Sequence, residues 1–561
     1  MKKLFVPFLL LFIALGAQAG DRLPGYAVAS ATQQATQAGL QILANGGNAF
    51  DAAVAVSAAL AVTEPTGSGL GGGGFWLLHR ASDGLNVFVD GREKAPYAAG
   101  PNMFLGKDGQ ADAALSRDGA LAAGIPGEPA ALAHIATRYG SKPLKQLLAP
   151  AIVLARDGFV VDRKLANAFA EQWPRLSAAA QLSLRIEQHI PQEGERLQQP
   201  ELAHTLELIA NNGRDGFYDG ETAKALLAAV HDAGGIWTQE DLRRYEVVER
   251  PPLITTFRDA RIITAPPPSA GGTTLAEIFT QLEVLGVSAD SNKDMPHVLI
   301  ETLRRAYRDR AAYLGDPDFV NIPMFRLLSR GHAIQLARSI DTRKATPSAQ
   351  LPPADLVPEG HHTTHFSIVD AQGNRVAATL SINLPFGSGF MAAGTGVFLN
   401  DEMDDFAAST TASNAYGLIG SSTNLVAPGK RPLSSMSPTF VEGPRGLLVL
   451  GTPGGSRIIT MVALGILGWT QGLDASQIVA LPRIHHQYLP DEVQFEPGAL
   501  SAEQQADLTK RGHTLKALTN PYGNMQVVTW NPASGQLQAA SDPRGVGAAG
   551  VVLNAALTTP K

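Results

Sequence analysis

Residues 51–62 constrain the fold of this chain more than any other segment. Wound as a helix, the run from Asp51 to Val62 presents apolar side chains on almost every side. Such a helix has to be covered on all sides, and this requires further layers of structure around it. The chain has 561 residues, of which 45% are hydrophobic and 17% charged, so it is long enough to supply those layers and a large core.

The remaining sequence predicts helices and strands in both halves of the chain. We expect residues 24–62 to be helical, and His297–Tyr313 to form a further helix. Helices should dominate from about Glu128 to Leu282, and Gly/Pro turns separate short strands after residue 363. Helix and strand patterns alternate between residues 457 and 530. This arrangement favours one layered α/β or α+β body over separate modules. The helical segments before residue 63 are Gln34–Ala44 and Asn48–Val62, and the predicted strands are Phe75–His79, Asn86–Asp90, 363–370, 375–383, 436–442 and 446–452.

The first 19 residues predict a signal peptide. Lys2 and Lys3 give a positive start, residues 4–15 are apolar, and Ala17-Gln18-Ala19 forms a small-residue cleavage site. The apolar run of about 12 residues is too short for a membrane span, and no later stretch is apolar for long enough. We therefore expect a soluble periplasmic or secreted protein that begins near Gly20.

Composition excludes several classes of function. The net charge is −6 and the basic residues are scattered, so the chain lacks the basic surface typical of nucleic-acid binding. The chain has no cysteine, which excludes disulfides and thiol catalysis.

Thr363 opens a segment that reads as a β-hairpin. Residues 340–362 before it lack periodicity and contain four prolines, which predicts an exposed linker. A turn near Gln372 would bring Ser381 and Asn383 back beside Thr363, on one face of the sheet. If the chain were cut before Thr363, its α-amino group would lie next to its hydroxyl and could act as a base. A strand-initiating Thr is more often structural, and this alternative remains open at the level of residues.

Two further patterns are better explained by structure than by ligand binding. Gly67-x-Gly69-x-x-Gly72 has the spacing of a dinucleotide fingerprint, but a helix precedes it and a strand follows, the reverse of the required order. Close backbone packing explains these glycines better. The histidines do not share one face with a carboxylate or thiolate partner, so we expect no metal and no cofactor. The histidines concerned are His361, His362, His365, His485 and His486.

Polar groups elsewhere in the chain could bind a substrate that carries one negative and one positive charge. Arg92 follows a predicted strand and could clamp a carboxylate. Glu402 and Asp405 lie in a turn-like stretch and could pair with an ammonium. Residues 451–457 precede a helix, where consecutive N–H groups could bind an oxyanion. Each signal is also explained by ordinary surface pairing, turn capping or solvation.

Taken in order, these segments resemble the γ-glutamyltranspeptidase (glutathione hydrolase) family of the N-terminal nucleophile hydrolase superfamily. The resemblance runs from about Ala27 to Leu553. It is carried by Gly46–Ala49, Gly71–Phe75, Pro266–Gly272, Asp309-Arg310, Gly315–Pro317, Thr363–Asp370, Asn400–Phe406, Arg431–Pro438 and Gly451–Ile458.

The resemblance implies a four-layer αββα sandwich and a precursor that cleaves itself between His362 and Thr363. The products would be a large subunit of residues 20–362 and a small subunit of residues 363–561, which remain together as a heterodimer. Thr363 would be the nucleophile, first in cleavage and then on the γ-amide of glutathione. Its freed α-amino group would be the base, and water or an amino acid or peptide would accept the γ-glutamyl group.

The resemblance also implies a role for each polar residue of the site. In the family pattern Arg92, Ser434 and Ser435 bind the α-carboxylate, and Asn383, Glu402 and Asp405 bind the α-ammonium. The N–H groups of Gly454 and Gly455 would bind the oxyanion. Ser381 stands where many relatives have Thr, and Glu402 where some bacterial members have Gln. Residues 407–420, with Tyr416, resemble the lid loop of many members.

Two other functions compete with this interpretation. One is a cephalosporin or glutaryl acylase of the same superfamily, which would bind a dicarboxylic acyl group. The other is a non-catalytic protein that captures γ-glutamyl peptides. A binding protein needs neither a nucleophile nor a cleavable linker, and Arg92, Asn383, Asp405 and the Ser434-Ser435 pair suit a free amino-acid head group.

Overall fold

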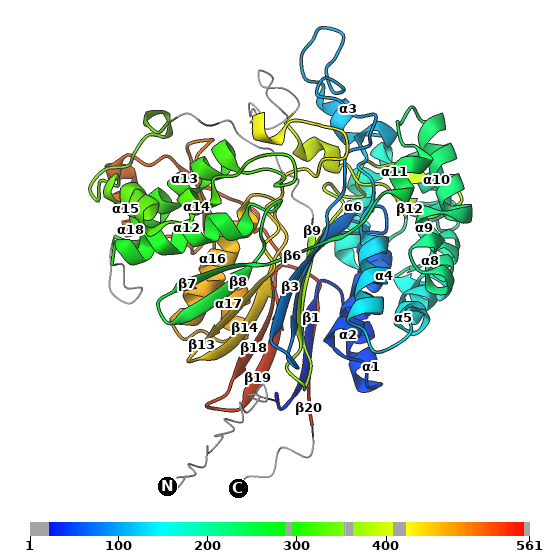
Figure 1. Ribbon diagram of the computed structural model, residues 1–561, viewed down its shortest axis with the longest axis horizontal. Helices are drawn as coiled ribbons and strands as arrows, with labels where there is room; N and C mark the ends of the chain where they lie inside the picture. Colours follow the sequence, from blue (N-terminus) through cyan, green and yellow to red (C-terminus); the bar gives the residue numbers. More distant parts are fainter. Residues whose placement is uncertain (1–21, 287–293, 353, 355–362, 408–421, 555–561) are drawn as a thin grey trace, which may run out of the picture.

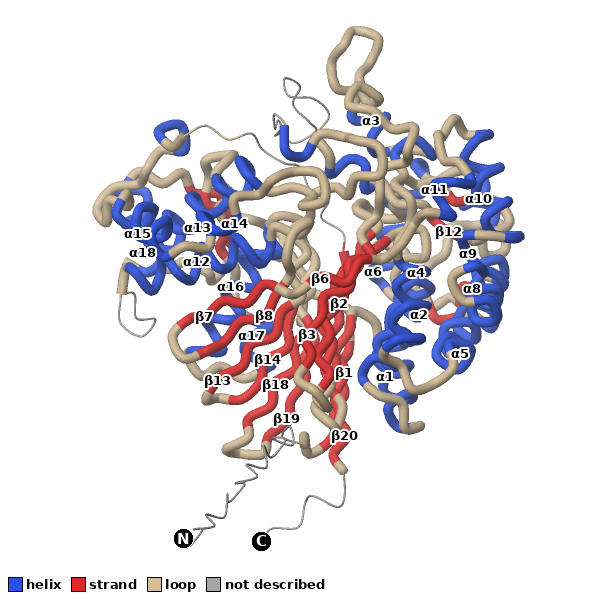
Figure 2. Tube along the Cα trace, in the orientation of Figure 1, coloured by secondary structure: helices blue, strands red, loops and turns tan. Residues whose placement is uncertain are grey.

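Two antiparallel sheets packed face to face form the centre of the molecule (Figures 1 and 2). The computed structural model describes residues 22–286, 294–352, 354, 363–407 and 422–554. The first sheet has the order β20 (Ala548–Leu553), β1 (Gly25–Ser30), β9 (Thr363–Val369), β10 (Arg375–Ser381), β2 (Gly73–Arg80), β3 (Leu85–Gly91), β6 (Val248–Arg250). The second has the order β19 (Gln536–Ser541), β18 (Gln526–Asn531), β14 (Gly446–Gly451), β13 (Thr439–Gly443), β8 (Ala260–Thr264), β7 (Leu253–Phe257).

Helices cover the outer face of each sheet (Figure 1). Beside the first sheet lie α1 (Gln33–Ala44), α2 (Ala49–Thr63), α4 (Glu128–Arg138), α5 (Leu144–Asp157), α6 (Arg163–Gln172), α8 (Pro200–Asn212), α9 (Asp215–Tyr218), α10 (Gly220–Asp232) and α11 (Gln239–Arg243). Beside the second lie α12 (Gly271–Val284), α13 (Met295–Tyr313), α14 (Met324–Leu327), α15 (Arg330–Arg338), α16 (Arg457–Thr470), α17 (Ala475–Ala480) and α18 (Ala502–Arg511).

Shorter elements connect these layers. They are α3 (Ala113–Arg117), α7 (Ala178–Leu184), the strands β4 (Phe159–Val160), β5 (Arg196–Leu197), β11 (Met391–Ala392), β12 (Val397–Phe398), β15 (Ile484–His485), β16 (Val493–Phe495) and β17 (Leu515–Ala517), and the 3-10 turns η1 (Ala120–Ala122), η2 (Trp173–Arg175), η3 (Ser348–Gln350), η4 (Glu402–Asp405) and η5 (Ser422–Asn424).

Helix α2 is buried along its whole length, as its apolar sequence predicts. Asn48 and Asp51 form a capping box at its start, each side chain accepting the other residue's backbone N–H. The helix packs against α1, α5 and the strands β9 and β10. It therefore forms the inner part of the helical layer behind the strand that Thr363 begins.

The central strands of the first sheet are buried on both faces, whereas its edge strand β20 is largely exposed. Along β2, Phe75 and Leu77 enter the core between the two sheets, whereas Trp76 and Leu78 enter the core under the helices, because strand side chains alternate between faces. Every residue of β9 and β10 is buried. Together with the second sheet and its helices, this confirms the predicted α+β fold of four layers, αββα.

The structure corrects two parts of the predicted secondary structure. Residues 25–30 were expected to be helical but form strand β1, which pairs with β9 and β20. The segment expected to be dominated by helices contains β7 and β8, which pair with each other and extend the second sheet through β13. Apart from the β7–β8 hairpin, the partners of these strands are distant in the sequence, so the local pattern does not reveal them.

The described part of the linker before Thr363 is mostly exposed, as the sequence predicts, and Ser348 anchors it. Ser348 is fully buried, and its hydroxyl accepts a hydrogen bond from Arg304 Nη1 at 2.6 Å. Its N–H donates to Asp491 Oδ2 at 2.7 Å. Residues 355–362, which include His361 and His362, and the predicted signal peptide lie outside the described residues. Within the described part of the chain, no helix is long and apolar enough to cross a membrane.

Candidate active site

Eight of the predicted site residues line one small cavity between the two sheets. Its volume of about 10 Å³ corresponds to roughly one water molecule. A substrate would therefore have to move side chains that now fill the site. The predicted residues that line the cavity are Arg92, Thr363, Ser381, Asn383, Asp405, Ser434, Ser435 and Gly455, joined by Met436 and Ile458.

Thr363 is the first residue of β9 and pairs directly with Ser381, the last residue of β10. Both side chains are almost completely buried, with relative exposures of 8% and 4%. The next side chain, Thr364, donates a hydrogen bond of 2.6 Å to Glu64 Oε2. Since neighbouring strand side chains point to opposite faces, Thr363 and Thr364 have different surroundings, and Thr363 faces the cavity.

The turn after β9 is fixed by Asp370. Its carboxylate accepts the N–H groups of Gln372 and Asn374, and it also accepts the N–H of Ala49 at the start of α2. This is the turn chemistry that Asp favours. The hairpin register that brings Ser381 opposite Thr363 is the one that the sequence predicts, and Asp370 ties it to the buried helix.

Asn383 lies just beyond β10 and has a left-handed backbone, with φ of +72°. Its N–H donates to Ser381 Oγ at 2.9 Å. Its side-chain Nδ2 donates to both the carbonyl and Oδ2 of Asp401, at 3.0 and 3.1 Å. Burial raises the pKa of Asp401 well above its usual value. Asp401 was not singled out from the sequence, although it directly precedes Glu402.

Arg92 forms ion pairs with both acidic residues that were predicted to bind an ammonium. Its Nη1 lies 2.7 Å from Glu402 Oε2, and its Nη2 lies 2.5 Å from Asp405 Oδ2. All three side chains are buried, and Glu93 lies 3.5 Å from the same guanidinium. Burial, together with the negative charge of Glu402, raises the pKa of Asp405 well above its usual value, and the same two causes raise the pKa of Glu93.

A second buried arginine, Arg310 of α13, contacts Ser435. Its Nε and Nη2 donate to Ser435 Oγ at 3.2 and 3.0 Å, and burial lowers the pKa of Arg310 to about 10. Ser434 is fixed by its backbone, since its N–H donates to the carbonyl of Pro268 at 3.0 Å. No role could be assigned to Arg310 from the sequence, because nothing local indicates which distant residue it contacts.

Gly454 and Gly455 form the turn between β14 and α16. Both have positive φ, +137° and +58°, a conformation that favours glycine. Their carbonyls accept the N–H groups of Arg457 and Ile458 in the first turn of α16. Among the described residues, neither glycine N–H donates a hydrogen bond. Their position beside the cavity suits the binding of an oxyanion.

Close backbone packing explains Gly71 to Gly74 of the glycine run, but not Gly69, where an added Cβ would meet only Ile382 Cγ2, at 3.9 Å. A Cβ at Gly72 would lie 2.2 Å from the carbonyl oxygen of Ser381, and one at Gly73 would lie 2.3 Å from that of Gly91. Both distances are too short for any side chain. Helix α2 precedes this run and strand β2 follows it, which is the order that the dinucleotide fingerprint excludes.

The histidines considered as metal ligands participate in hydrogen-bond networks. His365 lies between the sheets, where its ring nitrogens contact Thr379 and Ser367, and burial lowers its pKa to about 3. His485 contacts Thr460 and Gln487. His486 contacts Asp491 and the N–H of Tyr488. The predicted lid residue Tyr416 lies in 408–421, outside the described residues.

Comparison with known proteins agrees with the fold. A sequence model of the family described as Gamma-glutamyltranspeptidase matches residues 35–552. The glutathione hydrolase proenzyme of Escherichia coli (strain K12) is 42% identical over 527 residues, 92% of this chain and 90% of that protein.

The fold is also similar to those of solved structures. The γ-glutamyltranspeptidase of Helicobacter pylori is 39% identical with a TM-score of 0.56, covering 58% of this chain and 94% of that chain. The cephalosporin acylase of Bacillus halodurans is 26% identical with a TM-score of 0.81, covering 94% and 96%. The family match spans most of the chain, and the relative from E. coli is similar over nearly its full length. The chain therefore belongs to the γ-glutamyltranspeptidase family.

Proposed function

We propose that this protein is a self-cleaving γ-glutamyltransferase and glutathione hydrolase in which Thr363 is the nucleophile. The observation that carries the proposal is the cavity itself, which brings together Thr363 and seven polar or glycine residues, eight residues from six separate stretches of the chain. Family membership supports the activity, and the charges around Thr363 suit the substrate.

Cleavage of the precursor is the first step of the proposed mechanism. Thr363 Oγ attacks the carbonyl carbon of residue 362, and the peptide C–N bond breaks to leave an ester. Breaking the C–N bond frees the α-amino group of Thr363, and water then hydrolyses the ester, which releases a carboxylate at residue 362 and restores the Thr363 hydroxyl. An α-amine has a reference pKa near 8, so a useful fraction of it is unprotonated near neutral pH and can act as a base.

The two subunits, 20–362 and 363–561, should remain associated after cleavage. Strand β9 hydrogen-bonds to β1, and β10 hydrogen-bonds to β2. Two strands of the small subunit would thus lie in the middle of a sheet whose neighbouring strands belong to the large subunit. Breaking one bond before Thr363 leaves all of these hydrogen bonds in place.

In the second step Thr363 attacks the γ-amide of the substrate. The new Oγ–C bond forms, the C–N bond breaks, and the leaving amine takes a proton from the α-ammonium that Thr363 has just acquired. The N–H groups of Gly454 and Gly455 would stabilise the oxyanion as its charge develops, and Ser381 would support the nucleophile. Water or an amino acid or peptide amine then attacks the γ-glutamyl ester and restores the Thr363 hydroxyl.

The charges of the site favour a zwitterionic glutamyl group. Arg92 would bind its α-carboxylate with Ser434 and Ser435, while Glu402, Asp405 and Asn383 would bind its α-ammonium. When a zwitterion binds, the ion pairs of Arg92 with Glu402 and Asp405 would be replaced by one pair between Arg92 and the α-carboxylate and one between the two acidic residues and the α-ammonium. The net charge of the buried site stays unchanged. A dicarboxylic acyl group adds a negative charge beside carboxylates that are already crowded, and this is costly in a buried site.

A second candidate is a cephalosporin or glutaryl acylase, which the structural similarity to the Bacillus halodurans acylase favours. Hydrolysis of γ-glutamyl-p-nitroanilide and glutaryl-p-nitroanilide by the same preparation separates the two functions. We expect the γ-glutamyl compound to give the higher kcat/KM by at least about 100-fold, from about 3 kcal/mol for one charge-assisted contact with its ammonium. Preference for the glutaryl compound would establish the acylase instead.

The remaining expectations concern location and partners. The predicted signal peptide, residues 1–19, supports export to the periplasm or the medium. Its substrates would be glutathione and other γ-glutamyl compounds, with amino acids or peptides as acceptors, and the chemistry requires no cofactor.

A further inference from the structure

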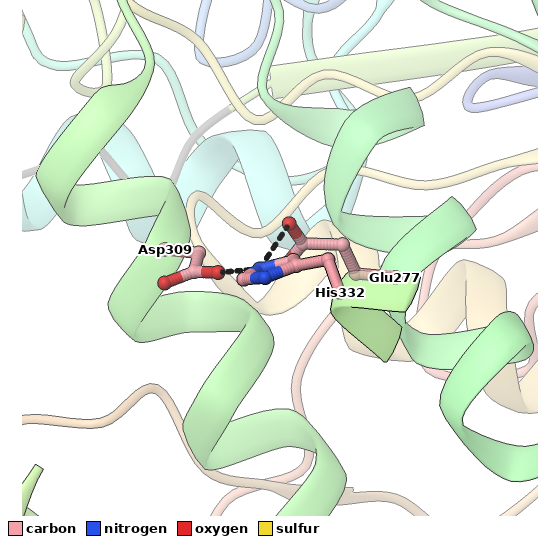
Figure 3. Close-up of side chains that lie close together, drawn as sticks. All are labelled: Glu277, Asp309 and His332. Carbon is pink, nitrogen blue, oxygen red and sulfur yellow. Dashed lines mark hydrogen bonds and ion pairs between the residues drawn. The ribbon is translucent and has the colours of Figure 1, made fainter. Parts of the chain in front are cut away.

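Three side chains outside the cavity converge from three different helices (Figure 3). Glu277 comes from α12, Asp309 from α13 and His332 from α15. His332 Nε2 lies 2.6 Å from Asp309 Oδ2 and 4.0 Å from Glu277 Oε1. One ligand atom from each residue lies within 4.8 Å of the others. One imidazole nitrogen and two carboxylate oxygens are therefore directed at a common point.

Glu277 is the member of this group that requires a partner. Its side chain is 3% exposed, and neither carboxylate oxygen has a hydrogen-bond partner among the described residues. A buried carboxylate without a partner is unfavourable unless a proton or a cation neutralises it. Figure 3 shows this carboxylate directed at the His332 ring.

The charges of Arg308 and Arg326 favour the ionised form of Glu277, but among the described residues neither arginine forms an ion pair with it. Arg308 Nη1 donates to the other oxygen of the aspartate, Asp309 Oδ1, at 2.6 Å. Arg326 lies over the ring of Tyr313, with its guanidinium carbon 4.4 Å from the centroid. Arg308 thereby fixes the orientation of Asp309, as outer-shell groups do for metal ligands, and leaves Asp309 Oδ2 directed at His332.

A solvent-accessible cavity gives access to the group. The cavity has a volume of about 600 Å³, and both Asp309 and His332 line it. An ion could enter from this side, and water could complete its coordination. Imidazole and carboxylate together suit first-row divalent ions such as Zn²⁺, and three protein ligands plus water are a common arrangement for Zn²⁺.

We propose that Glu277, Asp309 and His332 bind a divalent transition-metal ion, with Zn²⁺ as the best match, that joins α12, α13 and α15. Bonds of about 2.0–2.2 Å in a tetrahedral site place ligand atoms roughly 3.3–3.5 Å apart. The distance from His332 Nε2 to Asp309 Oδ2, 2.6 Å, is shorter than this range, and the distance to Glu277 Oε1, 4.0 Å, is longer. Binding therefore requires His332 to move away from Asp309 and toward Glu277. The ion would replace the proton now shared by His332 and Asp309. The sequence-based expectation of no metal rested on other histidines and did not include His332.

The test is zinc binding by the purified full-length protein after dialysis against EDTA. Isothermal titration with ZnCl₂, with metal content measured after gel filtration, should give one Zn²⁺ per chain. His332→Gln and Glu277→Gln should each weaken binding by at least 100-fold. His204→Gln is the matched control, because His204 also lies beside a glutamate, Glu221, but both side chains are exposed. This variant should bind like the wild type.

A second readout keeps the proposal open to refutation if Glu277→Gln does not fold. Zn²⁺ should raise the melting temperature of the wild type and of His204→Gln, but not that of His332→Gln, since only binding to the folded state stabilises it. Absence of binding at 100 µM Zn²⁺ would overturn the proposal. So would tight binding that persists in His332→Gln, because the ion would then occupy another site.

Discussion

Arg92 and Asp405 are joined by an ion pair of 2.5 Å in the buried site, although the family pattern assigns them to opposite charges of the substrate. Glu402 pairs with the same guanidinium at 2.7 Å. The intact chain thus neutralises its own binding groups while the cavity is nearly closed. A zwitterionic substrate can replace these pairs, because its carboxylate can bind Arg92 while its ammonium binds Asp405 and Glu402. The ion pairs of the closed site therefore fit the proposed specificity for γ-glutamyl compounds.

Asp405→Asn tests this exchange. The amide retains an acceptor for Arg92 but loses the charge that would bind the ammonium, so we expect a loss of about 1.5–3 kcal/mol, or roughly 10–150-fold in kcat/KM for γ-glutamyl-p-nitroanilide. Hydrolysis of the glutaryl compound, which has no ammonium, should fall much less. Asp404→Asn is the control, because Asp404 contacts Ser116 and Arg117 instead of Arg92. Equal losses in both variants would contradict this role of Asp405.

Arg310→Lys tests whether Arg310 positions Ser435. The guanidinium donates two hydrogen bonds to Ser435 Oγ, and a lysine cannot reproduce this fork. We expect KM for the γ-glutamyl substrate to rise about 10-fold, from the loss of one charge-assisted hydrogen bond of about 1.5 kcal/mol. The kcat value should change much less, which is the signature of binding shared by ground and transition states. Arg308→Lys, on the same helix but directed at Asp309, should leave KM unchanged. A fall in kcat at constant KM would contradict the positioning role.

Ser381 should matter through its hydroxyl rather than its size. Ser381→Ala removes the acceptor for the N–H of Asn383, at a cost of about 1–3 kcal/mol, and it removes the polar neighbour of Thr363. Cleavage and turnover should both slow by at least about 10-fold, whereas Ser381→Thr retains the hydroxyl and adds a methyl group that restricts χ1. Time courses of chain cleavage on denaturing gels and kcat measurements would check this. An alanine variant as fast as the wild type would exclude a role for the hydroxyl.

Glu128 should make stability depend on pH. Burial raises its pKa from 4.5 to about 8, opposed by the backbone N–H of Gly69. Between these values the folded chain keeps a proton that the unfolded chain releases, so the contribution of Glu128 to stability is complete below about pH 4.5 and is lost as pH rises toward 8. Glu128→Gln lacks this dependence, and its stability relative to the parent should increase by up to about 1.4 kcal/mol for each pH unit in that window.

Urea unfolding at pH 5, 6.5 and 8 measures this difference, with Thr363→Ala as the parent so that the chain stays in one piece. Glu221→Gln is the control, because Glu221 also lies in the first turn of a helix but is exposed. Parallel stability profiles for Glu128→Gln and its parent would show that the buried carboxyl is not protonated in this range.

Local sequence patterns were sufficient for the elements whose partners are nearby. The hairpin of β9 and β10 follows from its turn residues, and the burial of α2 follows from its continuous apolar surface. Strands β1 and β8 were missed because they pair with distant segments, and β7 was missed with β8, its neighbour and only partner among the described strands. The sequences of β1 and β8 carry no clear alternation of polar and apolar residues, since strands buried on both faces have no polar side.

The same limit applies to the site. Arg92, Glu402 and Asp405 could be selected because charged residues after strands and in turns often reach a site, and the family resemblance gave them roles. Their ion pairs with one another could not be predicted, because they depend on a closed cavity. Asp401 and Arg310 were not assigned roles for a similar reason, since burial and tertiary contact distinguish them from ordinary charged residues.

The central claim is that Thr363 becomes active only when the bond before it breaks, and N-terminal sequencing of the smaller fragment tests it most directly. Scaled from 59.0 kDa for 561 residues, the fragments 20–362 and 363–561 should run near ~36 and ~21 kDa on a denaturing gel. The smaller one should begin Thr363-Thr364-His365, and Thr363→Ala should remain a single inactive chain. A Thr363→Ala protein that is cut at the same bond, or an intact wild-type chain with full activity, would contradict the account.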